Sequence, residues 1–485
     1  MTDLVVYKKN EVYLKVECEP HIKYELSDQF TFEVPEAAFM PAYRKKHWDG
    51  KIRLFSPTTG EIYCGLLDRL ITWCEENQYK ISFEGNKYYG DVLESNPMIT
   101  MAGVKQFMTS ITKFRPRDYQ IKAVYQALKN NRKLIVSPTA SGKSMMIYTI
   151  VRYFVAKGEK ILIVVPTTSL VEQMYKDFME YGWNSEEFCH RVYAGYEKNT
   201  DLPVTITTWQ SVYKLSKQYF DDYTCVIGDE AHQFKAKSLT KIMTKLHDAK
   251  YRIGFTGTLD GTQTHKWVLE GLFGPVDKIV NTEQLVREGY LAKFKINVLI
   301  LKHPEQKFET YEDEIQYLIS NEVRNNFIKN LALDLEGNTL ILYSRVETHG
   351  EILFNSINSI NSDRLVAFIH GGVDTEEREK VRSITEQENN AIIVASYGTF
   401  STGINIKRLH NVIFASPSKS RIRNLQSIGR VLRKGQAKDL ATLYDVSDDI
   451  TRNGKKNYTL NHLVERIKIY NEENFDYNII NVDIR

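Results

Sequence analysis

The sequence lacks the marks of a secreted, zinc-binding or membrane-spanning protein. It has five cysteines, all in the first half of the chain and none in a CxxC pair. An odd number without metal-type spacing indicates reduced thiols and no zinc site. No apolar run is long enough to cross a bilayer, and Met1-Thr2-Asp3 opens no signal peptide. We therefore expect a cytoplasmic protein, and a monomer in solution.

The chain also lacks an excess of charge of either sign. Its 64 Lys and Arg residues against 61 Asp and Glu residues leave a net charge of only +3. Any nucleic-acid-binding surface must then be local. With 485 residues, 42% of them hydrophobic, the chain is long enough for roughly three domains.

A short strand, a tight loop and a helix are predicted from Lys133 onward. Residues 133–136 form a short, largely apolar run, and residues 145–155 carry apolar residues at helical spacing. A loop that winds into a helix N-terminus points backbone N–H groups and the helix dipole at a phosphate. Lys143 would neutralise the β- and γ-phosphates of ATP, and Ser144 would hold Mg²⁺. The loop begins with Ser137 where the usual pattern has glycine, so an ordinary polar turn is the alternative.

Four more predicted strands end in polar clusters. Because the carboxyl ends of parallel strands meet at one edge of a sheet, these clusters would face the same crevice as Lys143. In one of them, Asp229 would serve the magnesium ion and Glu230 would orient and deprotonate the attacking water. The strands span 161–165, 204–207, 223–228 and 251–255, and the clusters are Pro166-Thr167-Thr168-Ser169, Thr208-Trp209-Gln210-Ser211, Asp229-Glu230-Ala231-His232 and Thr256-Gly257-Thr258.

Two segments before the nucleotide loop are also unusual. The amide of Gln120 could donate to and accept from an adenine edge, although a surface position is the alternative. Further upstream, five cations surround Trp48 and a predicted Asp49-Gly50 hairpin turn. The cations could grip phosphates while an aromatic ring packs on a base. A solvated hairpin in which Trp48 anchors the core is the alternative. The cluster consists of Arg44, Lys45, Lys46, Trp48, Lys51 and Arg53.

Together the motifs resemble those of superfamily 2 helicases, in order, over residues 114–449. The second half adds a strand ending in Ser344-Arg345, a motif at Phe368–Gly372, the stretch from Ser396 to Gly403, and a QxxGRxxR motif at 426–433. Within this superfamily, the chain resembles the UvsW-like helicases of tailed phages in three segments. These are Trp48–Leu54, Pro166-Thr167-Thr168 and Ala395-Ser396-Tyr397-Gly398.

The resemblance implies an α/β protein with two tandem RecA-like parallel-sheet motor domains after a small α+β DNA-binding domain. It implies an ATP-dependent DNA helicase, with ATP and Mg²⁺ as cofactors, that acts on Holliday junctions, stalled forks and R-loops in recombination, repair and replication. Its place would be the cytoplasm of the host cell. The expected divisions are a DNA-binding domain at 1–95, a linker at 96–112, motor domains at 113–290 and 291–450, and a helical tail at 451–485.

The resemblance also implies roles for individual residues. ATP would lie between the motor domains, with Arg430 and Arg433 as arginine fingers. Asn405 stands where many relatives carry aspartate. The implied catalytic residues are Lys143, Asp229, Glu230, Gln426, Arg430 and Arg433, with Ser144 and Asp229 on the metal. The implied nucleotide-binding residues are Arg117, Gln120, Ser137, Pro138, Thr139, Ala140, Ser141, Gly142, Lys143, Ser144, Gly403 and Asn405. The implied DNA-binding residues are the amino-terminal cluster and Thr167, Thr168, Thr208, Trp209, Gln210, Ser344, Arg345, His370, Tyr397, Gly398 and Thr399.

Ordinary helix caps remain an alternative for these strand-end residues. For the whole protein, an RNA helicase of the DEAH type would need large domains for which too few residues follow Asp449. An ATP-switched DNA-binding or annealing protein would have no use for a hydrolytic base such as Glu230. A restriction-type translocase would need a nuclease or methylase stretch, which we do not find. The apolar spacing from Leu460 to Ile467 predicts a helix docked on the second motor domain, with a partner-binding helix as the alternative.

Overall fold

The computed structural model describes most of the chain and divides it into two compact units. One unit comprises Met1–Ser137 and Gly142–Ile279, and the other Pro138–Ser141 and Val280–Arg485. Within the described part, no helix is both long and apolar enough to span a membrane. The described residues are 2–34, 37–39, 41–138, 140–233, 236–257, 259, 263–360, 363–403, 406, 408–416 and 440–484.

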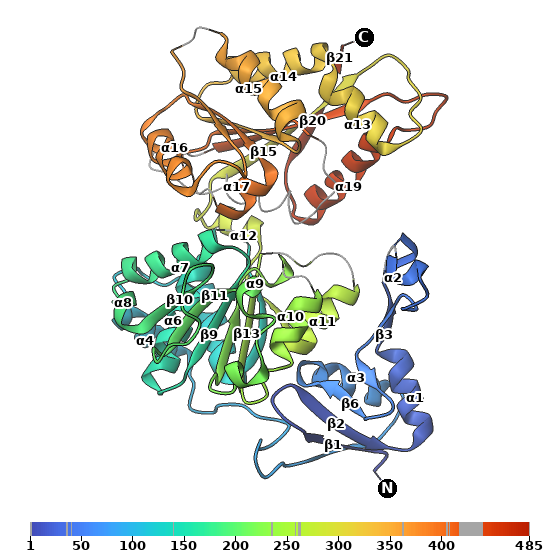
Figure 1. The fold of residues 1–485 in the computed structure, drawn as a ribbon, viewed down its shortest axis with the longest axis vertical. Helices are drawn as coiled ribbons and strands as arrows, with labels where there is room; N and C mark the ends of the chain where they lie inside the picture. Colours follow the sequence, from blue (N-terminus) through green and yellow to red (C-terminus); the bar gives the residue numbers. More distant parts are fainter. Residues whose placement is uncertain are drawn as a thin grey trace. The chain divides into compact units, whose positions relative to one another are not determined.

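The first unit begins with a mixed sheet of five strands in the order β5-β6-β2-β1-β7 (Figure 1). Alternate residues of β1 are buried, as expected for a sheet with one covered face. The elements up to the first motor domain are β1 Leu4–Lys8, β2 Tyr13–Cys18, α1 Pro20–Gln29, β3 Thr31–Glu33, α2 Pro41–Arg44, β4 Lys51–Arg53, β5 Phe55–Ser56, β6 Glu61–Tyr63, α3 Leu67–Glu76, β7 Ile81–Glu84 and α4 Met101–Ile111.

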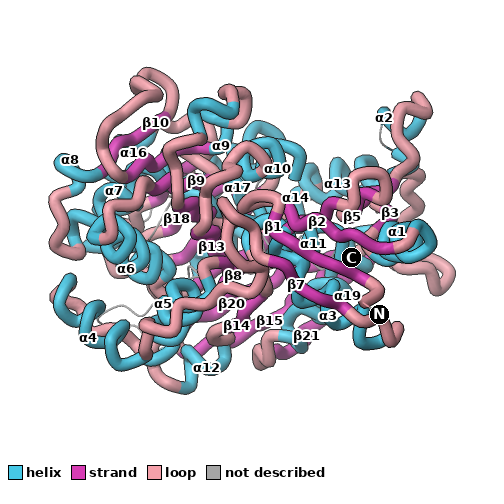
Figure 2. The backbone as a smooth tube through the Cα atoms, turned by 90° about the horizontal axis from the view of Figure 1, so that it is seen from below, coloured by secondary structure: helices cyan, strands magenta, loops and turns pink. Residues whose placement is uncertain are grey.

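The prediction of a hairpin turn at Asp49-Gly50 is wrong, because the connection between the two paired strands is much longer than these two residues. The two strands that pair are β3 and β4, with Thr31 opposite Arg53, so the connection between them includes α2 as well. Gly50 has φ +79° and its carbonyl accepts the Val34 N–H, so it closes the base of this long connection. Figure 1 and Figure 2 both show α2 protruding from the amino-terminal domain at the end of this ribbon.

The second part of the first unit is a parallel sheet of seven strands, in the order β10-β11-β9-β12-β13-β8-β14. All five residues of β9 and of β11 are buried, which is typical of parallel strands covered on both faces. The strands lie between α6 and α7 on one side and α10 and α11 on the other (Figure 1 and Figure 2). The elements are α5 Asp118–Asn130, β8 Arg132–Val136, α6 Lys143–Ala156, β9 Ile161–Val165, α7 Thr168–Glu180, α8 Ser185–Phe188, β10 Cys189–Val192, β11 Val204–Thr208, α9 Trp209–Val212, β12 Cys225–Gly228, α10 Ala236–Met243, β13 Tyr251–Thr256, α11 Gln263–Phe273 and β14 Val276–Lys278.

The second unit is built on another seven-stranded parallel sheet, in the order β17-β18-β16-β19-β20-β15-β21. Two such sheets after a mixed sheet confirm the predicted α/β fold. The elements are α12 Thr282–Arg287, β15 Lys293–Lys302, α13 Tyr311–Ser320, α14 Glu322–Asp334, β16 Thr339–Tyr343, α15 Glu351–Asn358, β17 Val366–Ile369, α16 Thr375–Gln387, β18 Ile392–Ser396, α17 Tyr397–Gly403, β19 Asn411–Phe414, β20 Leu440–Asp449, α19 Tyr458–Glu472 and β21 Tyr477–Asp483.

The carboxy-terminal residues are part of this second sheet. Helix α19 is attached to β20 through Arg466, whose guanidinium donates to Asp445 at 2.8 Å inside the core. The prediction of a helix docked on the second motor domain agrees with this contact. Strand β21, which pairs in parallel with β15 at the sheet edge, was not predicted.

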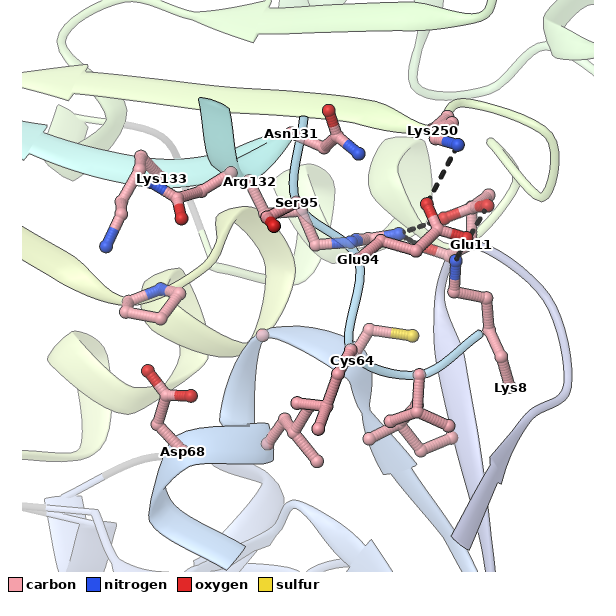
Figure 3. A pocket seen from close by; sticks show the side chains of 17 residues that line it. Lys8, Glu11, Cys64, Asp68, Glu94, Ser95, Asn131, Arg132, Lys133 and Lys250 are labelled. Carbon is pink, nitrogen blue, oxygen red and sulfur yellow. Dashed lines mark hydrogen bonds and ion pairs between the residues drawn. The ribbon is translucent and has the colours of Figure 1, made fainter. Parts of the chain in front are cut away.

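A buried network of charges joins the amino-terminal domain to the first motor domain. Glu11 lies between Lys8, whose Nζ is 3.2 Å from its Oε1, and Arg132 at the start of β8. Lys8 also lies 3.2 Å from Glu94, which Lys250 contacts at 2.8 Å. Figure 3 shows these side chains at a cavity of about 290 Å³. The cavity lies at the amino end of β8, the end away from the predicted nucleotide loop.

Aromatic packing attaches the ribbon of β3 and β4 to the same motor domain. Trp267 of α11 packs edge-on against Phe32 at 4.5 Å between ring centroids, and the Arg69 guanidinium lies 4.4 Å from its ring. Contacts of this type add to the burial of the rings themselves. The amino-terminal domain is therefore packed against the first motor domain at two separate places.

We predict that Glu11→Ala destabilises the first unit strongly. Removing the carboxylate deprives the nearly buried Arg132 of its ion pair and leaves Lys8 with Glu94 alone. Breaking such a buried pair typically costs about 3–5 kcal/mol of unfolding free energy. Denaturant unfolding measures this change. Lys9→Ala is the control, since Lys9 pairs with Glu61 at the surface and such pairs contribute at most about 1 kcal/mol. Equal losses in the two variants would show that the network does not join the domains.

Candidate nucleotide and DNA sites

The predicted nucleotide loop turns sharply into α6. Gly142 precedes the helix with φ +83°, a conformation that suits glycine. A Cβ atom at this position would lie 2.4 Å from Nε2 of Gln120. The backbone conformation favours glycine here, and the close contact with the Gln120 side chain places the start of α5 against the loop.

Lys143 is the first residue of α6 and reaches across the carboxyl edge of the sheet. Its Nζ lies 3.3 Å from Oε1 of Glu230 and donates to the Ser137 carbonyl at 3.4 Å. Only 10% of the Lys143 side chain and 14% of the Glu230 side chain are exposed. The predicted phosphate-binding lysine and the predicted catalytic base are therefore neighbours in a nearly buried pair.

Asp229 and Glu230 directly follow β12, as the sequence analysis predicted. Glu230 has φ +49°, which is uncommon for a residue with a side chain, and its N–H donates to Oδ1 of Asp229 at 2.9 Å. Strained backbone of this kind is found at functional sites, where the surrounding structure holds it in place. The turn leaves both carboxylates at the strand end.

The electrostatics of this pair favour a bound cation. Burial raises the pKa of the Asp229 carboxyl to about 7, the charge of Glu230 adds to the rise, and Lys143 opposes it. The charged form of a carboxyl whose pKa is raised by burial and by a neighbouring carboxylate would be stabilised by a further cation. Asp229 and Ser144 offer a carboxylate and a hydroxyl, the oxygen ligands that Mg²⁺ prefers. The two residues thus fit the predicted magnesium site.

Two contacts around this site were not predicted. The Ser144 hydroxyl lies 2.7 Å from the Tyr181 hydroxyl. His232 contacts Thr256 at the end of β13 at 2.5 Å and lies 3.5 Å from Oε2 of Glu230. His232 therefore connects the end of β12, with its two carboxylates, to the end of β13. Tyr181 follows α7, and no sequence signal connects it to the nucleotide loop.

Gln120, which is predicted to bind adenine, also caps the start of α5. It is buried, and its Oε1 accepts the Arg117 N–H at 2.9 Å in a capping box at the start of α5. The Arg117 guanidinium donates to the Tyr119 hydroxyl at 2.7 Å. The structure thus places Arg117 and Gln120 beside each other, with Gln120 against the loop.

The strand-end residues of the first motor domain lie at the same sheet edge. Thr167 caps α7 by accepting the Leu170 N–H at 3.4 Å, and Thr168 is the first residue of that helix. Thr208 is buried, with its hydroxyl 2.8 Å from Ser211. Gln210 is exposed and donates to the Pro166 carbonyl at 3.4 Å, beside the half-buried Trp209. Among these residues, Thr168 and Gln210 are the exposed ones.

The second motor domain shows a similar division between exposed and buried residues. Ser344 is exposed after β16, and Arg345 forms an ion pair with Glu312. His370 accepts the Gly372 N–H at 3.1 Å after β17. Of the other three candidates, Tyr397 and Thr399 lie in the interior, and Gly398 is exposed. The Tyr397 hydroxyl donates to the Ser416 carbonyl, so a contact with DNA there would come from the backbone near Gly398, where a Cβ atom would meet open space.

The amino-terminal cations lie on and beside α2 and β4. Arg44, Lys45 and Lys46 are exposed, while Trp48 is half-buried and its Nε1 donates to the Lys51 carbonyl at 2.8 Å. Arg53 pairs with Asp49 at 2.5 Å and Lys51 lies 3.8 Å from Glu33, both at the surface. Trp48 thus supports the turn that carries the cations. Of the other predicted residues, Thr139, Asn405, Gln426, Arg430 and Arg433 lie outside the described residues, and only the backbone of Gly403 is described.

Three family models match the chain in succession. They are the amino-terminal domain of DNA helicase UvsW at residues 3–84, the res subunit of type III restriction enzymes at 113–261, and the helicase conserved C-terminal domain at 323–435. The chain is 33% identical to the ATP-dependent DNA helicase uvsW of Enterobacteria phage T4, over 98% of each chain. It is 25% identical to the DNA 3'-5' translocase XPB2 of Sulfurisphaera tokodaii, over 66% of this chain and 79% of that protein.

A solved structure has the same organisation over the whole length. The crystal structure of T4 UvsW matches with a TM-score of 0.53 and 31% sequence identity, covering 100% of both chains. The amino-terminal domain and both parallel sheets therefore have counterparts in one known protein.

We predict that Lys143→Ala and Glu230→Gln abolish ATP turnover while leaving the fold and DNA binding largely intact. Each change removes a charge that would act on the phosphates or the water, and losing one such partner typically costs about a hundredfold or more in rate. DNA-stimulated phosphate release measures this. Lys133→Ala, at the other end of β8, and Glu180→Gln, at the exposed end of α7, are matched controls. Turnover in Glu230→Gln within a few-fold of wild type would rule out the assignment.

We predict that Asp229→Asn stabilises the nucleotide-free protein at pH 8. Burial raises the pKa of the folded Asp229 carboxyl to about 7, whereas an unfolded aspartate has a pKa of about 3.9. Between these values the folded state holds a proton that the unfolded state releases, so the contribution of Asp229 to stability falls as pH rises. The asparagine variant escapes this loss.

Thermal unfolding at pH 8 and pH 5.5 measures the effect. The midpoint of Asp229→Asn should exceed that of wild type at pH 8, and by less at pH 5.5. Asp222→Asn, at an exposed position, should show no such pH dependence. An Asp229→Asn midpoint below wild type at pH 8 would contradict the raised pKa.

Proposed function

Because the chain belongs to the UvsW family of ATP-dependent DNA helicases, we propose that it unwinds and remodels branched DNA, namely Holliday junctions, stalled forks and R-loops. The processes served would be recombination, repair and replication. The proposal of ATP hydrolysis is supported by one observation: Lys143, Asp229 and Glu230 lie together at one sheet edge. Lysine, a metal-binding carboxylate and a water-activating carboxylate are the parts that ATP hydrolysis requires.

In the proposed reaction, the triphosphate lies along the loop 137–144. The Lys143 ammonium would leave Glu230 and bind the β- and γ-phosphates, so Glu230 would become available to orient the attacking water and accept its proton. Ser144 and Asp229 would hold Mg²⁺, which supplies positive charge to the phosphate oxygens when bound. Arg430 and Arg433 remain predicted arginine fingers, since they lie outside the described residues.

Discrimination of a branch from a linear duplex would come from the amino-terminal domain. The strand-end groups of the motor domains offer hydroxyls, amides and backbone, which suit one strand's backbone. The cations of α2 and β4 form a second, separate group on a protruding ribbon. Its base packs on Trp267 of the first motor domain, so a DNA arm held there would keep a fixed relation to that motor domain.

The test of this function is an ATPase assay with different nucleic acids. Turnover should rise most with forked DNA and four-way junctions, less with single strands, and least with linear duplex and RNA. Equal stimulation by RNA and DNA would favour an RNA helicase instead. No stimulation by any nucleic acid would contradict the proposal.

We predict that Lys45→Ala/Lys46→Ala/Lys51→Ala impairs unwinding of forks and junctions much more than single-strand-stimulated ATPase. Each phosphate contact removed should reduce the slope of junction binding against salt by roughly one unit. Anisotropy titrations over a salt series measure the slope. A triple variant of the exposed residues Lys80, Lys87 and Lys105 is a control of equal charge. Equal losses of unwinding and ATPase would assign the cluster to folding or motor function.

A further inference from the structure

The second unit contains a basic cavity that none of the helicase motifs includes. It measures about 560 Å³ and lies where β15 and β20 end. Such a volume is in the range of known ligand sites. Its lining combines four cations, two aromatic rings and several amides: Lys307, Arg452, Lys455 and Lys456; Phe308 and Tyr458; Gln306, Asn453, Asn457 and Asn461.

A tight hairpin presents three of these cations. Arg452 and Lys455 exchange backbone hydrogen bonds of 3.2 and 2.9 Å. Between them, Asn453 and Gly454 have φ +49° and +74°, the pattern of a two-residue turn with left-handed residues. The turn gives Arg452, Lys455 and Lys456 defined positions at the rim, and all three are exposed.

Within the described part of the chain, the cations at the cavity have no acidic partner. Among the described residues, no ion pair joins Lys307, Arg452, Lys455 or Lys456 to a carboxylate. The one acid in the lining, Glu314, is buried and fully used: its Oε1 accepts from Asn457 and Thr459, and its Oε2 accepts from the Tyr458 N–H at 2.8 Å. Glu314 thus caps α19 and is not available to pair with the four cations of the lining.

The floor of the cavity is held rigidly. Asn457 donates to Oε1 of Glu314 at 2.8 Å and to the Asp448 carbonyl at 3.1 Å. The Asp448 side chain in turn binds His303 and Arg324, both at 2.8 Å, inside the core. The cations therefore stand on a preformed base, which lowers the entropic cost of binding.

Two aromatic side chains complete the lining. The Tyr458 ring is 42% exposed and its hydroxyl donates to the Glu309 carbonyl at 3.2 Å. Phe308 is half-buried against Tyr317, with ring centroids 5.3 Å apart. Held rings beside a row of cations are the combination that binds single-stranded nucleic acid, with the rings stacking on bases and the cations on phosphates.

The cavity shares a sheet edge with the predicted DNA-binding residues of this motor domain. Ser344 and Arg345 follow β16, and in the sheet β20 and β15 lie two and three strands away from β16. At a strand spacing of about 4.8 Å, the cavity lies roughly 10–15 Å from them along this edge. That separation corresponds to a few nucleotides of an extended strand.

We infer that this cavity is a binding site for the phosphodiester backbone of DNA, extending the DNA path of the second motor domain beyond its helicase motifs. This inference rests on the proposed function, because it takes DNA as the polyanion. Lys307, Arg452, Lys455 and Lys456 contact phosphates, and Tyr458 packs against a base or sugar.

The test compares two triple variants of equal charge. Arg452→Ala/Lys455→Ala/Lys456→Ala removes the hairpin cations, and Lys293→Ala/Lys295→Ala/Lys468→Ala removes three exposed lysines, two of them at the opposite end of β15. Binding of a fluorescent single strand is titrated over a salt series without ATP. The slope of log affinity against log salt should flatten by about two units in the hairpin variant and stay at the wild-type value in the control.

An unchanged slope in the hairpin variant, or an equal change in the control, would overturn the inference. A loss of ATP affinity with an unchanged DNA slope would overturn it too, since the cavity would then bind a free nucleotide. If the triple variant folds poorly, Lys456→Gln alone should flatten the slope by roughly 0.7 units. Failure of the proposed function is distinguishable, because it would appear in wild-type protein as the absence of ATP-dependent unwinding of branched DNA.

Discussion

The parallel pairing of β13 between β12 and β8 is the constraint on which the candidate ATP site depends. Gly228 pairs with Gly254, and Thr256 pairs with Val136, so the ends of all three strands stand at one edge. β12 and β8 are two strands apart, roughly 10 Å, and the long side chain of Lys143 reaches back to Glu230 over this gap. No local sequence pattern could bring these residues together without that sheet.

Glycine in β13 makes this arrangement sterically possible. A Cβ atom on Gly254 would lie 2.7 Å from a Leu134 methyl carbon and 2.9 Å from the Phe273 ring. Because α11 packs closely here, it also brings Trp267 to the base of the amino-terminal ribbon. The packing that aligns the candidate catalytic strand ends therefore also fixes the candidate DNA-binding ribbon on the first motor domain.

Much of the motor fold was predictable from the sequence because its strands are continuous apolar runs. The strands 161–165 and 339–343 have the predicted bounds. Strand β12, Cys225–Gly228, ends directly before the predicted acidic pair. β21 was missed because it is an exposed edge strand that contains asparagine and aspartate, residues that are rare in strands. The Asp49-Gly50 turn was misjudged because a favourable dipeptide does not determine which strands pair.

Details of the candidate sites were less predictable, since they depend on contacts between distant segments. The burial of Tyr397, the Tyr181 contact with Ser144 and the salt-bridge network at Glu11 each involve residues from separate elements. The basic cavity likewise joins the segment after β15 to the hairpin after β20. Sequence patterns identify motifs, whereas these features follow from sheet order.

We propose that ATP hydrolysis at this sheet edge drives the remodelling of branched DNA. The most direct measurement follows strand separation of a labelled four-way junction by wild-type protein with ATP and with a non-hydrolysable ATP analogue. The account predicts rapid separation with ATP and none beyond the protein-free rate with the analogue. Equal separation with both nucleotides would contradict it, because binding alone would then suffice and the protein would be an ATP-switched DNA-binding protein.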